Sequence, residues 1–366
     1  MLKAFFQQFL LLFKKKNPTT KQNTPQNLSK MDQLIQKNPV MLSKKLYVLC
    51  VGVNEYKAST VSNLGGCVND ANHILNYFTG TSQNTDFEID GKILVNEEAT
   101  KANIVEHFQT HLGQAKKGDV AVFYFSGHGA EESADEVFEA YSHTDSFTTL
   151  VCHDSRVDAS DLADKELRYL INQISGQEDH PHFVLITDSC HSGGATRSMD
   201  DLKPRLTKKT DTRKWSDFIF ADQISRKDVE KAVSLKDVFP EGEHVHLSSC
   251  EDGELAYEVG GSGVFTSALL DILKQSSGQV SYQDINSRTR LMLGGRFPQK
   301  PTIYATQTDG YNELFLGGSI ENKGITAPVK YNTTSNKWIF GLGTVHGIND
   351  HPSHATEVEL FDIQNN

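Results

Sequence analysis

The chain has 366 residues, five cysteines and a formal net charge of -11 at neutral pH. This length is enough for one large α/β domain or two smaller ones, with ample apolar material for a core. The negative charge argues against nucleic-acid binding, because neutralising phosphates requires a broad basic face. Few, odd-numbered and widely spaced cysteines are not typical of a disulfide framework, which favours a reducing, cytoplasmic compartment.

Residues 1–40 are predicted to be a leader and linker. Within them, residues 4–13 (AFFQQFLLLF) are about half the length that spans a bilayer, and lysines follow. We interpret them as a poorly ordered leader, and a segment that contacts a membrane surface is the alternative. Residues 14–40 are rich in Lys, Asn, Gln, Thr and Pro, a composition typical of a linker. The folded domain is expected over residues 41–316.

Short apolar runs alternate with helical patterns from residue 46 onward. Most runs are nearly continuous in apolar residues, as expected for strands covered on both faces. Helical patterns between them predict an α/β fold with a mostly parallel sheet and helices on both sides. The predicted strands are 46–53, 119–126, 149–154, 182–189, 244–250 and 301–306, and the predicted helices are 68–80, 101–114, 162–175, 263–275 and 281–293.

Two regions interrupt this alternation. Residues 197–236 are polar, and within them residues 203–214 carry six basic side chains against one acidic. On an acidic chain this contrast predicts an exposed loop. Residues 317–366 have short alternating stretches and turn residues, which predict a small β-rich C-terminal appendage.

Reactive side chains follow two of the predicted strands. SGHG follows one strand and DSCHSGG ends another, and the carboxyl ends of parallel strands are where chemistry collects. A thiol becomes a useful nucleophile as the thiolate, which a nearby imidazole favours. His128 is a better partner for Cys190 than the adjacent His191, because neighbours on extended backbone point to opposite faces. The N–H groups of Gly129 and Cys190 are predicted to bind a developing oxyanion.

YFSGHG together with ITDSCHSGG resembles the catalytic segments of the caspase-like cysteine peptidases. The metacaspase branch is the more similar one, since the animal signature Q-A-C-x-G is absent. LGGCVNDAN, LSSCEDGELAYE and GVFTSALLDIL match further segments in the family's order. The resemblance covers residues 46–306 and implies a three-layer α/β/α caspase-like fold. It also implies an endopeptidase working through a thioester, with His128 as general base and acid and Cys190 as nucleophile.

The resemblance also assigns an S1 pocket, the site for the substrate residue before the scissile bond. Asp70 and Asp188 would form its acidic floor, and Cys67 and Ser248 would line it. A buried Arg or Lys needs a paired counter-charge. Protein or peptide substrates cut after Arg, and less strongly after Lys, are therefore expected. The basic segment 203–214 is then a candidate for self-cleavage.

Plainer interpretations of the same residues stay open. Cys190 is alternatively an inert buried thiol, and His128 a turn histidine. Asp70 alternatively supports a helix start, and Asp188 a strand-end turn. The domain as a whole is alternatively an idle scaffold, or a peptidase with a non-basic preference. The trigger is equally open between cleavage, a partner docking on the terminal extensions, and a metal.

No cofactor is expected, although calcium activation stays open. Calcium-dependent metacaspases place acids downstream of the His segment and just after the Cys segment. Here the first region offers Asp145, Asp161 and Asp164, but Lys165 stands where a second acid is expected, and Arg197 stands near the later acid. Calcium takes about six to eight oxygen ligands, and a nearby cation opposes it. The two Cys-His pairs lack zinc-ligand spacing.

Overall fold

A computed structural model describes residues 44–80, 87–138, 141, 145–190, 202–251, 253–318, 329–332 and 337–340. The predictions for residues 1–40 and Arg197, and most of the prediction for 317–366, lie outside these residues. None of the helices in the described part combines the length and apolarity that a bilayer crossing needs.

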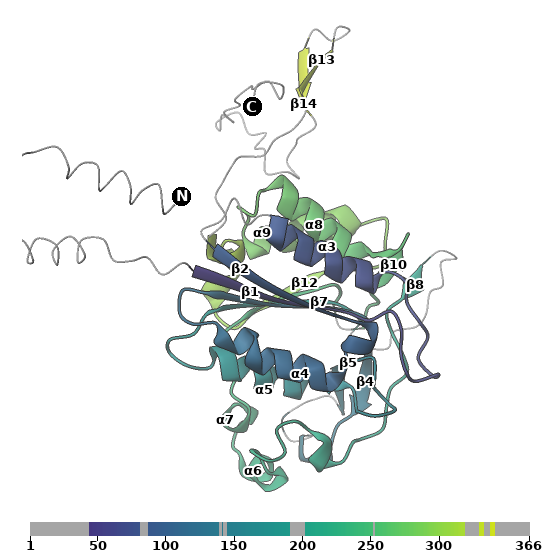
Figure 1. The fold of residues 1–366 in the computed structure, drawn as a ribbon, viewed down its shortest axis with the longest axis vertical. Helices are drawn as coiled ribbons and strands as arrows, with labels where there is room; N and C mark the ends of the chain where they lie inside the picture. Colours follow the sequence, from purple (N-terminus) through teal and green to yellow (C-terminus); the bar gives the residue numbers. More distant parts are fainter. Residues whose placement is uncertain are drawn as a thin grey trace, which may run out of the picture. The chain divides into compact units, whose positions relative to one another are not determined.

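The centre of the domain is a sheet whose described strands run in the order β12-β9-β7-β3-β1-β2 (Figure 1). Its neighbouring strands are parallel, apart from the antiparallel pair of β12 and β9. Every residue of VAVFYFS in β3 is buried, because this strand has neighbours on both sides and cover on both faces. The strands are β1 (Lys44–Gly52), β2 (Phe87–Val95), β3 (Val120–Ser126), β7 (His182–Asp188), β9 (Val245–Ser248) and β12 (Thr302–Ala305).

Helices cover both faces of this sheet. Figure 1 shows α3, α8 and α9 on one face, α4 and α5 on the other, and α6 and α7 beyond α5. The predicted three-layer α/β/α fold is confirmed. The helices are α3 (Cys67–Gly80), α4 (Lys101–Thr110), α5 (Asp164–Ser175), α6 (Arg226–Lys231), α7 (Leu235–Val238), α8 (Val264–Gln275) and α9 (Tyr282–Leu293).

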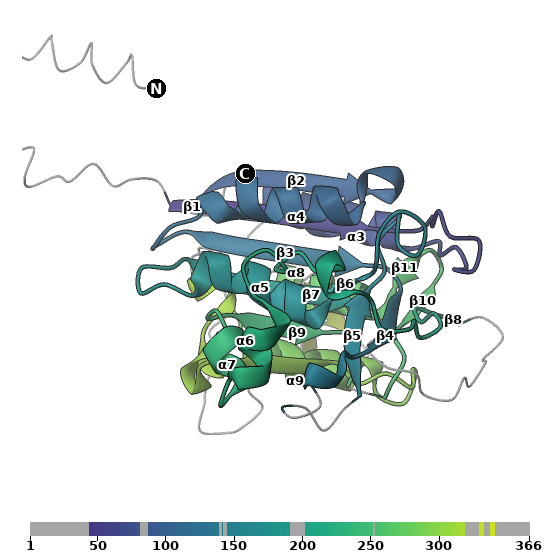
Figure 2. The ribbon, with the colours of Figure 1, turned by 90° about the horizontal axis from the view of Figure 1, so that it is seen from below.

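Two small antiparallel sheets lie at one end of the central sheet, on the side where β3 ends (Figure 2). One has the order β4-β5-β6, and the other β11-β10-β8. A separate hairpin pairs β13 with β14 inside the region predicted to be β-rich. The bounds are β4 (Gly129–Ser133), β5 (Ser146–Leu150), β6 (Leu162–Ala163), β8 (Lys203–Pro204), β10 (Tyr257–Val259), β11 (Ser262–Gly263), β13 (Val329–Asn332) and β14 (Lys337–Phe340).

One strand prediction was wrong, and one strand of the central sheet was missed. Residues 149–154 were expected in the central sheet, but β5 ends at Leu150 and belongs to a small sheet. The edge strand β2 was missed, because its sequence FEIDGKILV is mostly half-exposed and lacks a continuous apolar run. Edge strands need fewer apolar residues, so periodicity detects them poorly.

The predicted exposed loop is wrong for two of its arginines. Within the described residues of 197–236, Arg205 is 0% exposed and Arg213 is 9% exposed. Each guanidinium is enclosed by carboxylates, which is the condition under which a charged side chain tolerates burial.

Candidate active site

The two reactive segments leave neighbouring strands at the same level. Strands β3 and β7 are parallel, with Ser126 in register with Asp188. His128 and Cys190 each follow by the same offset, so both lie at the carboxyl edge of the sheet. The backbones are in close contact there, because a Cβ on Gly129 would lie 1.6 Å from the carbonyl oxygen of Cys190. Only glycine fits at position 129.

The backbone of Arg205 lies between these two segments. Its carbonyl oxygen accepts hydrogen bonds from the N–H of Gly129 (2.9 Å) and of Cys190 (3.3 Å), and its own N–H donates to the carbonyl of Ala256 (2.9 Å). These two N–H groups are the ones that the sequence analysis predicts to bind a developing oxyanion. A carbonyl held by two fixed N–H groups is polarised for nucleophilic attack.

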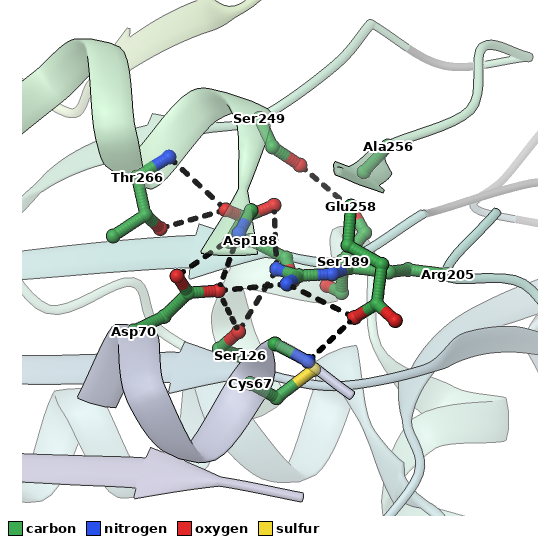
Figure 3. A network of polar contacts seen from close by, with 12 residues as sticks. Cys67, Asp70, Ser126, Asp188, Ser189, Arg205, Ser249, Ala256, Glu258 and Thr266 are labelled. Atoms are coloured by element: carbon green, nitrogen blue, oxygen red, sulfur yellow. Dashed lines mark hydrogen bonds and ion pairs between the residues drawn. The ribbon is translucent and has the colours of Figure 1, made fainter. Parts of the chain in front are cut away.

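The side chain of Arg205 is enclosed by acidic groups (Figure 3). Its Nη2 lies 2.7 Å from Asp70 Oδ2 and 3.6 Å from Glu258 Oε2, and its Nη1 lies 3.0 Å from Asp188 Oδ1. Nη1 also donates to Ser126 Oγ (2.9 Å). Burial alone would lower the pKa of Arg205, but the facing negative charges, Asp188 foremost, raise it well above its ordinary value. The enclosed group is therefore a charged guanidinium.

The first turn of α8 holds the two aspartates. The N–H of Gly263 donates to both Asp70 oxygens (2.9 Å each), and Thr266 donates its N–H (3.1 Å) and hydroxyl (2.6 Å) to Asp188 Oδ2. A Cβ on Gly263 would lie 2.2 Å from Asp188 Oδ2, so this position also requires glycine. The positive end of the helix favours charged carboxylates. Burial still raises the pKa of Asp70, and Arg205 is the strongest opposing influence.

Glu258 is a third carboxylate that sequence reasoning did not single out. Its two oxygens accept from the N–H groups of Gly65 (2.8 Å) and Gly66 (2.9 Å), which tie β10 to the loop before α3. The available signal in the sequence was its position: Glu258 is a charged residue inside LSSCEDGELAYE that directly follows apolar residues. Ser126, Gly263 and Thr266 were also missed, although each lies in a quoted segment.

The ring of His128 is oriented by backbone groups. Its Nε2 lies 2.8 Å from the carbonyl oxygen of Ser62, and a carbonyl only accepts, so Nε2 carries the proton. Its Nδ1 is buried and has no hydrogen-bond partner among the described residues. Burial lowers the pKa of His128 to about 4. The ring is therefore neutral, with Nδ1 as the basic nitrogen.

Tyr56 fixes the other side of the same ring. Its hydroxyl accepts from the backbone N–H of His128 (2.8 Å) and donates to the carbonyl of Val53 (3.1 Å). The two rings pack with centroids 5.1 Å apart. Tyr56 therefore sets both the position and the tilt of the imidazole.

The thiol of Cys190 is neutral in this state. Burial raises its pKa to about 12, partly offset by hydrogen bonds from the backbone of Ala256 and Arg205. Its Sγ accepts from the N–H of Ala256 at 3.0 Å. The Cys190 thiol and the His128 imidazole are therefore both neutral, and a thiol becomes a strong nucleophile only when a base removes its proton.

The two other residues predicted to line the pocket, Cys67 and Ser248, lie in different places. Cys67 lies in the group around Arg205 (Figure 3), and burial raises its pKa to about 12, against the opposing charge of Arg205. Ser248 is in register with Thr187 and lines with it a cavity of about 320 Å³ beside α5. Because side chains alternate along a strand, Ser248 faces away from the side of the sheet that carries Asp188.

The acids weighed as calcium ligands each face a cation. The pairs are Asp145 with Lys209 (3.8 Å), Asp161 with Arg156 (2.9 Å) and Asp164 with Lys165 (2.6 Å). Among the described residues, no group of three or more His, Cys, Asp or Glu side chains could hold a metal ion.

Comparison with known proteins identifies the family. A family model described as a caspase domain matches residues 45–311. The chain belongs to the caspase-domain family. It is 28% identical over 303 residues to Metacaspase-3 of Trypanosoma cruzi (strain CL Brener), covering 76% of this chain and 75% of that protein. It is 27% identical to Metacaspase-5 of Trypanosoma brucei brucei, covering 75% of this chain and 54% of that protein.

The relation to the metacaspases confirms the resemblance seen in the motifs. The chain is a metacaspase-type, caspase-like peptidase, a hydrolase of the cysteine endopeptidase type. Among solved structures, protein GSU0716 from Geobacter sulfurreducens matches with a TM-score of 0.52 and 20% identity, covering 76% of this chain and 100% of that one. At that identity the match supports the fold alone.

Proposed function

We propose that this caspase-domain peptidase cleaves after Arg, and less efficiently after Lys, and that its first substrate is its own Arg205–Leu206 bond. One observation carries the proposal. Arg205 has its guanidinium among three carboxylates and its carbonyl on the amides of Gly129 and Cys190. A substrate residue at the point of attack needs the same two contacts.

The chemistry follows from the atoms around that carbonyl. Nδ1 of His128 takes the thiol proton of Cys190, and the sulfur attacks the carbonyl carbon of Arg205. The Gly129 and Cys190 amides stabilise the oxyanion, and Nδ1 then protonates the nitrogen of Leu206 as the C–N bond breaks. A thioester remains, which water hydrolyses. The thiol must first turn from Ala256 towards His128.

The preference for Arg over Lys follows from the shape of the guanidinium. Nη1 bonds Ser126 and faces Asp188, while Nη2 bonds Asp70. A planar fork reaches separate partners at once, whereas an ammonium is a single point. A neutral residue would leave three buried carboxylates without a cation, which is strongly unfavourable.

The residues before the scissile bond bind as an added strand. Lys203 and Pro204 form β8 and pair antiparallel with Glu258 and Tyr257 of β10. Main-chain pairing of this kind supplies affinity without demanding particular side chains. It supports recognition of an extended peptide with its specificity concentrated at the arginine.

A fluorogenic peptide library scanned at the position before the scissile bond tests this function. We assay wild type and Arg205→Gln, which removes the competing guanidinium, each with and without Cys190→Ala. Arg peptides are expected to exceed Lys peptides by roughly tenfold, the factor for about 1.4 kcal/mol, and Cys190→Ala is expected to abolish both. If proteins with and without Cys190→Ala hydrolysed the peptides at equal rates, the result would favour the idle scaffold. Fastest cleavage after a neutral residue would favour the alternative of a peptidase with a non-basic preference.

The same assay, run with calcium chloride and with EGTA, addresses the metal. We propose that the two conditions give equal rates, because Asp161 and Asp164 already face Arg156 and Lys165. A rate that depends on calcium would contradict this proposal while leaving the arginine preference intact.

Tyr56→Phe is expected to lower kcat by roughly tenfold with little change in KM. The substitution leaves the buried N–H of His128 without its acceptor, at a cost of about 1–3 kcal/mol. Tyr77→Phe is the matched control, because the Tyr77 hydroxyl is buried without a hydrogen-bond partner among the described residues. A Tyr56→Phe enzyme with the kcat of Tyr77→Phe would show that the hydroxyl does not position the base.

A further inference from the structure

The chain after Arg205 runs beside β4 and is parallel to it at two isolated β-bridges, Leu206 with Gly129 and Thr210 with Glu132. The N–H of Thr207 donates to the carbonyl of Gly129 (3.1 Å), and the N–H of Thr210 donates to the carbonyl of Glu131 (2.9 Å). The N–H of Ser133 donates back to the carbonyl of Thr210 (3.0 Å). The segment on the leaving-group side of the Arg205–Leu206 bond is therefore held by main-chain bonds of its own.

Arg213 anchors this segment. Its Nε and Nη2 each lie 2.6 Å from an oxygen of Glu132, and its Nη1 lies 2.9 Å from Glu166. Nη2 also donates to the carbonyl of Asp161 (2.8 Å). All three charged side chains are at least nine-tenths buried. We name Arg213, Glu132 and Glu166 the Arg213 clamp; a bidentate buried pair of this kind is among the stronger polar contacts.

An aromatic cluster continues the attachment beyond the clamp. The guanidinium of Arg213 lies 4.7 Å from the ring centroid of Phe218. Phe218 and Phe220 are buried and pack in one apolar cluster with Phe138 and Phe239. None of these contacts involves the scissile bond, so cutting that bond leaves them in place.

We propose that the Arg213 clamp holds the newly formed amino terminus of Leu206 beside the thioester, where it competes with water. The inference rests on the proposed self-cleavage. A tether of a few residues gives the amine an effective concentration of about millimolar or more. The cut chain stays together as two fragments, and net cleavage is slow because the bond reseals.

The resealing step is the reverse of acylation. The amine nitrogen of Leu206 attacks the thioester carbonyl of Arg205, a C–N bond forms and the C–S bond breaks. The sulfur leaves as a thiolate and recovers its proton from the amine through Nδ1 of His128. Hydrolysis uses water in place of the amine and gives the carboxylate of Arg205. No other reactant is needed.

The acyl side is retained by independent contacts. Arg205 stays among Asp70, Asp188 and Glu258, and β8 stays on β10. Both products are therefore held at the reacting atoms. Loosening only the amine side is expected to increase the net rate of self-cleavage, which is the opposite of what a purely structural anchor predicts.

The test compares self-cleavage in wild type, Arg213→Gln and Glu132→Gln by intact mass. Both variants are expected to cut at least about fivefold faster, because the tethered amine is lost. Arg226→Gln is the matched control, since Arg226 lies in the same downstream region but pairs with Asp135 and Glu136 at a partly exposed site. It is expected to cut at the wild-type rate.

A second readout does not depend on any variant folding normally. In purified cut wild type returned to neutral buffer, the Cys190 thiol re-forms the thioester from the Arg205 carboxylate with release of water, and the Leu206 amine then displaces the sulfur. A measurable fraction of full-length chain is therefore expected, and alkylation of Cys190 is expected to prevent it. Arg213 and Glu132 variants that cut no faster, together with no re-formed chain, would overturn the inference and leave the peptidase intact. Absence of any cut in wild type and in all three variants would overturn both this inference and the proposed self-cleavage.

Discussion

Purified wild-type protein is expected to contain fragments ending at Arg205 and beginning at Leu206, and Cys190→Ala protein is expected to stay intact. The carbonyl of Arg205 already lies on the two amides that would stabilise its oxyanion. Loss of the nucleophile costs several orders of magnitude in related chemistry, about 10⁶ for a serine peptidase. Intact-mass measurement on both proteins after identical incubation reads the result directly.

Substitutions within the basic segment test whether Arg205 is the site. Arg205→Lys is expected to slow the cut and Arg205→Gln to remove it, because only a cation satisfies the surrounding carboxylates. Lys208 is exposed in the same segment, so Lys208→Gln is the control that should cut normally. A cut after Lys208 with the Arg205 bond intact, or the same fragments from Cys190→Ala protein, would rule out the proposed site.

Asp188→Asn is expected to have the second-largest effect, on both activity and stability. Asp188 and Arg205 are fully buried and paired, and removing one member of a buried pair costs about 3–5 kcal/mol. Hydrolysis of Arg peptides is expected to fall by roughly 10²-fold or more, since in the proposed function the same charge would bind the substrate arginine. Urea unfolding in the Cys190→Ala background measures the stability change without self-cleavage.

A double-mutant cycle separates pairing from general damage. Asp188→Asn combined with Arg205→Gln is expected to be less destabilised than the sum of the single variants, because neither group is then left unpaired. Asp179→Asn is the control, since Asp179 pairs with Lys117 where both side chains are more than 70% exposed; exposed pairs of this kind contribute little to stability. If the changes in unfolding free energy of the two single variants simply added in the double variant, the Asp188–Arg205 contact would contribute little to stability.

Much of the scaffold was predictable because its signals are local. The buried strands β1, β3 and β7 are continuous apolar runs, and the helical patterns between them imply parallel pairing. The segments SGHG and DSCHSGG then fall at one sheet edge by topology alone. Strand β2 escaped because an edge strand can be half exposed, and β5 was misassigned because an apolar run does not reveal which sheet it joins.

The sequence predicted only some of the residues in the candidate site. Residue types and spacing indicated His128, Cys190 and Gly129, and the family resemblance implied Asp70 and Asp188. The parallel register of β3 and β7 brings together the segments of all of these except Asp70, which lies in α3. Ser248 was assigned to the pocket from its segment, but strand alternation turns it to the other face. Glu258 was missed because its role depends on how β10 packs against the loop before α3.

Sequence by itself determined the peptidase scaffold and the chemical groups that it carries, since both are expressed in short apolar runs and contiguous motifs. Nothing local distinguishes Arg205 from Lys208, Lys209 or Arg213 in the same basic run. Only the tertiary structure decided which cation enters the acidic pocket, because pairing of β8 with β10 sets the register. The carboxylates that surround Arg205 come from α3, β7 and β10, and these segments meet only when the chain has folded.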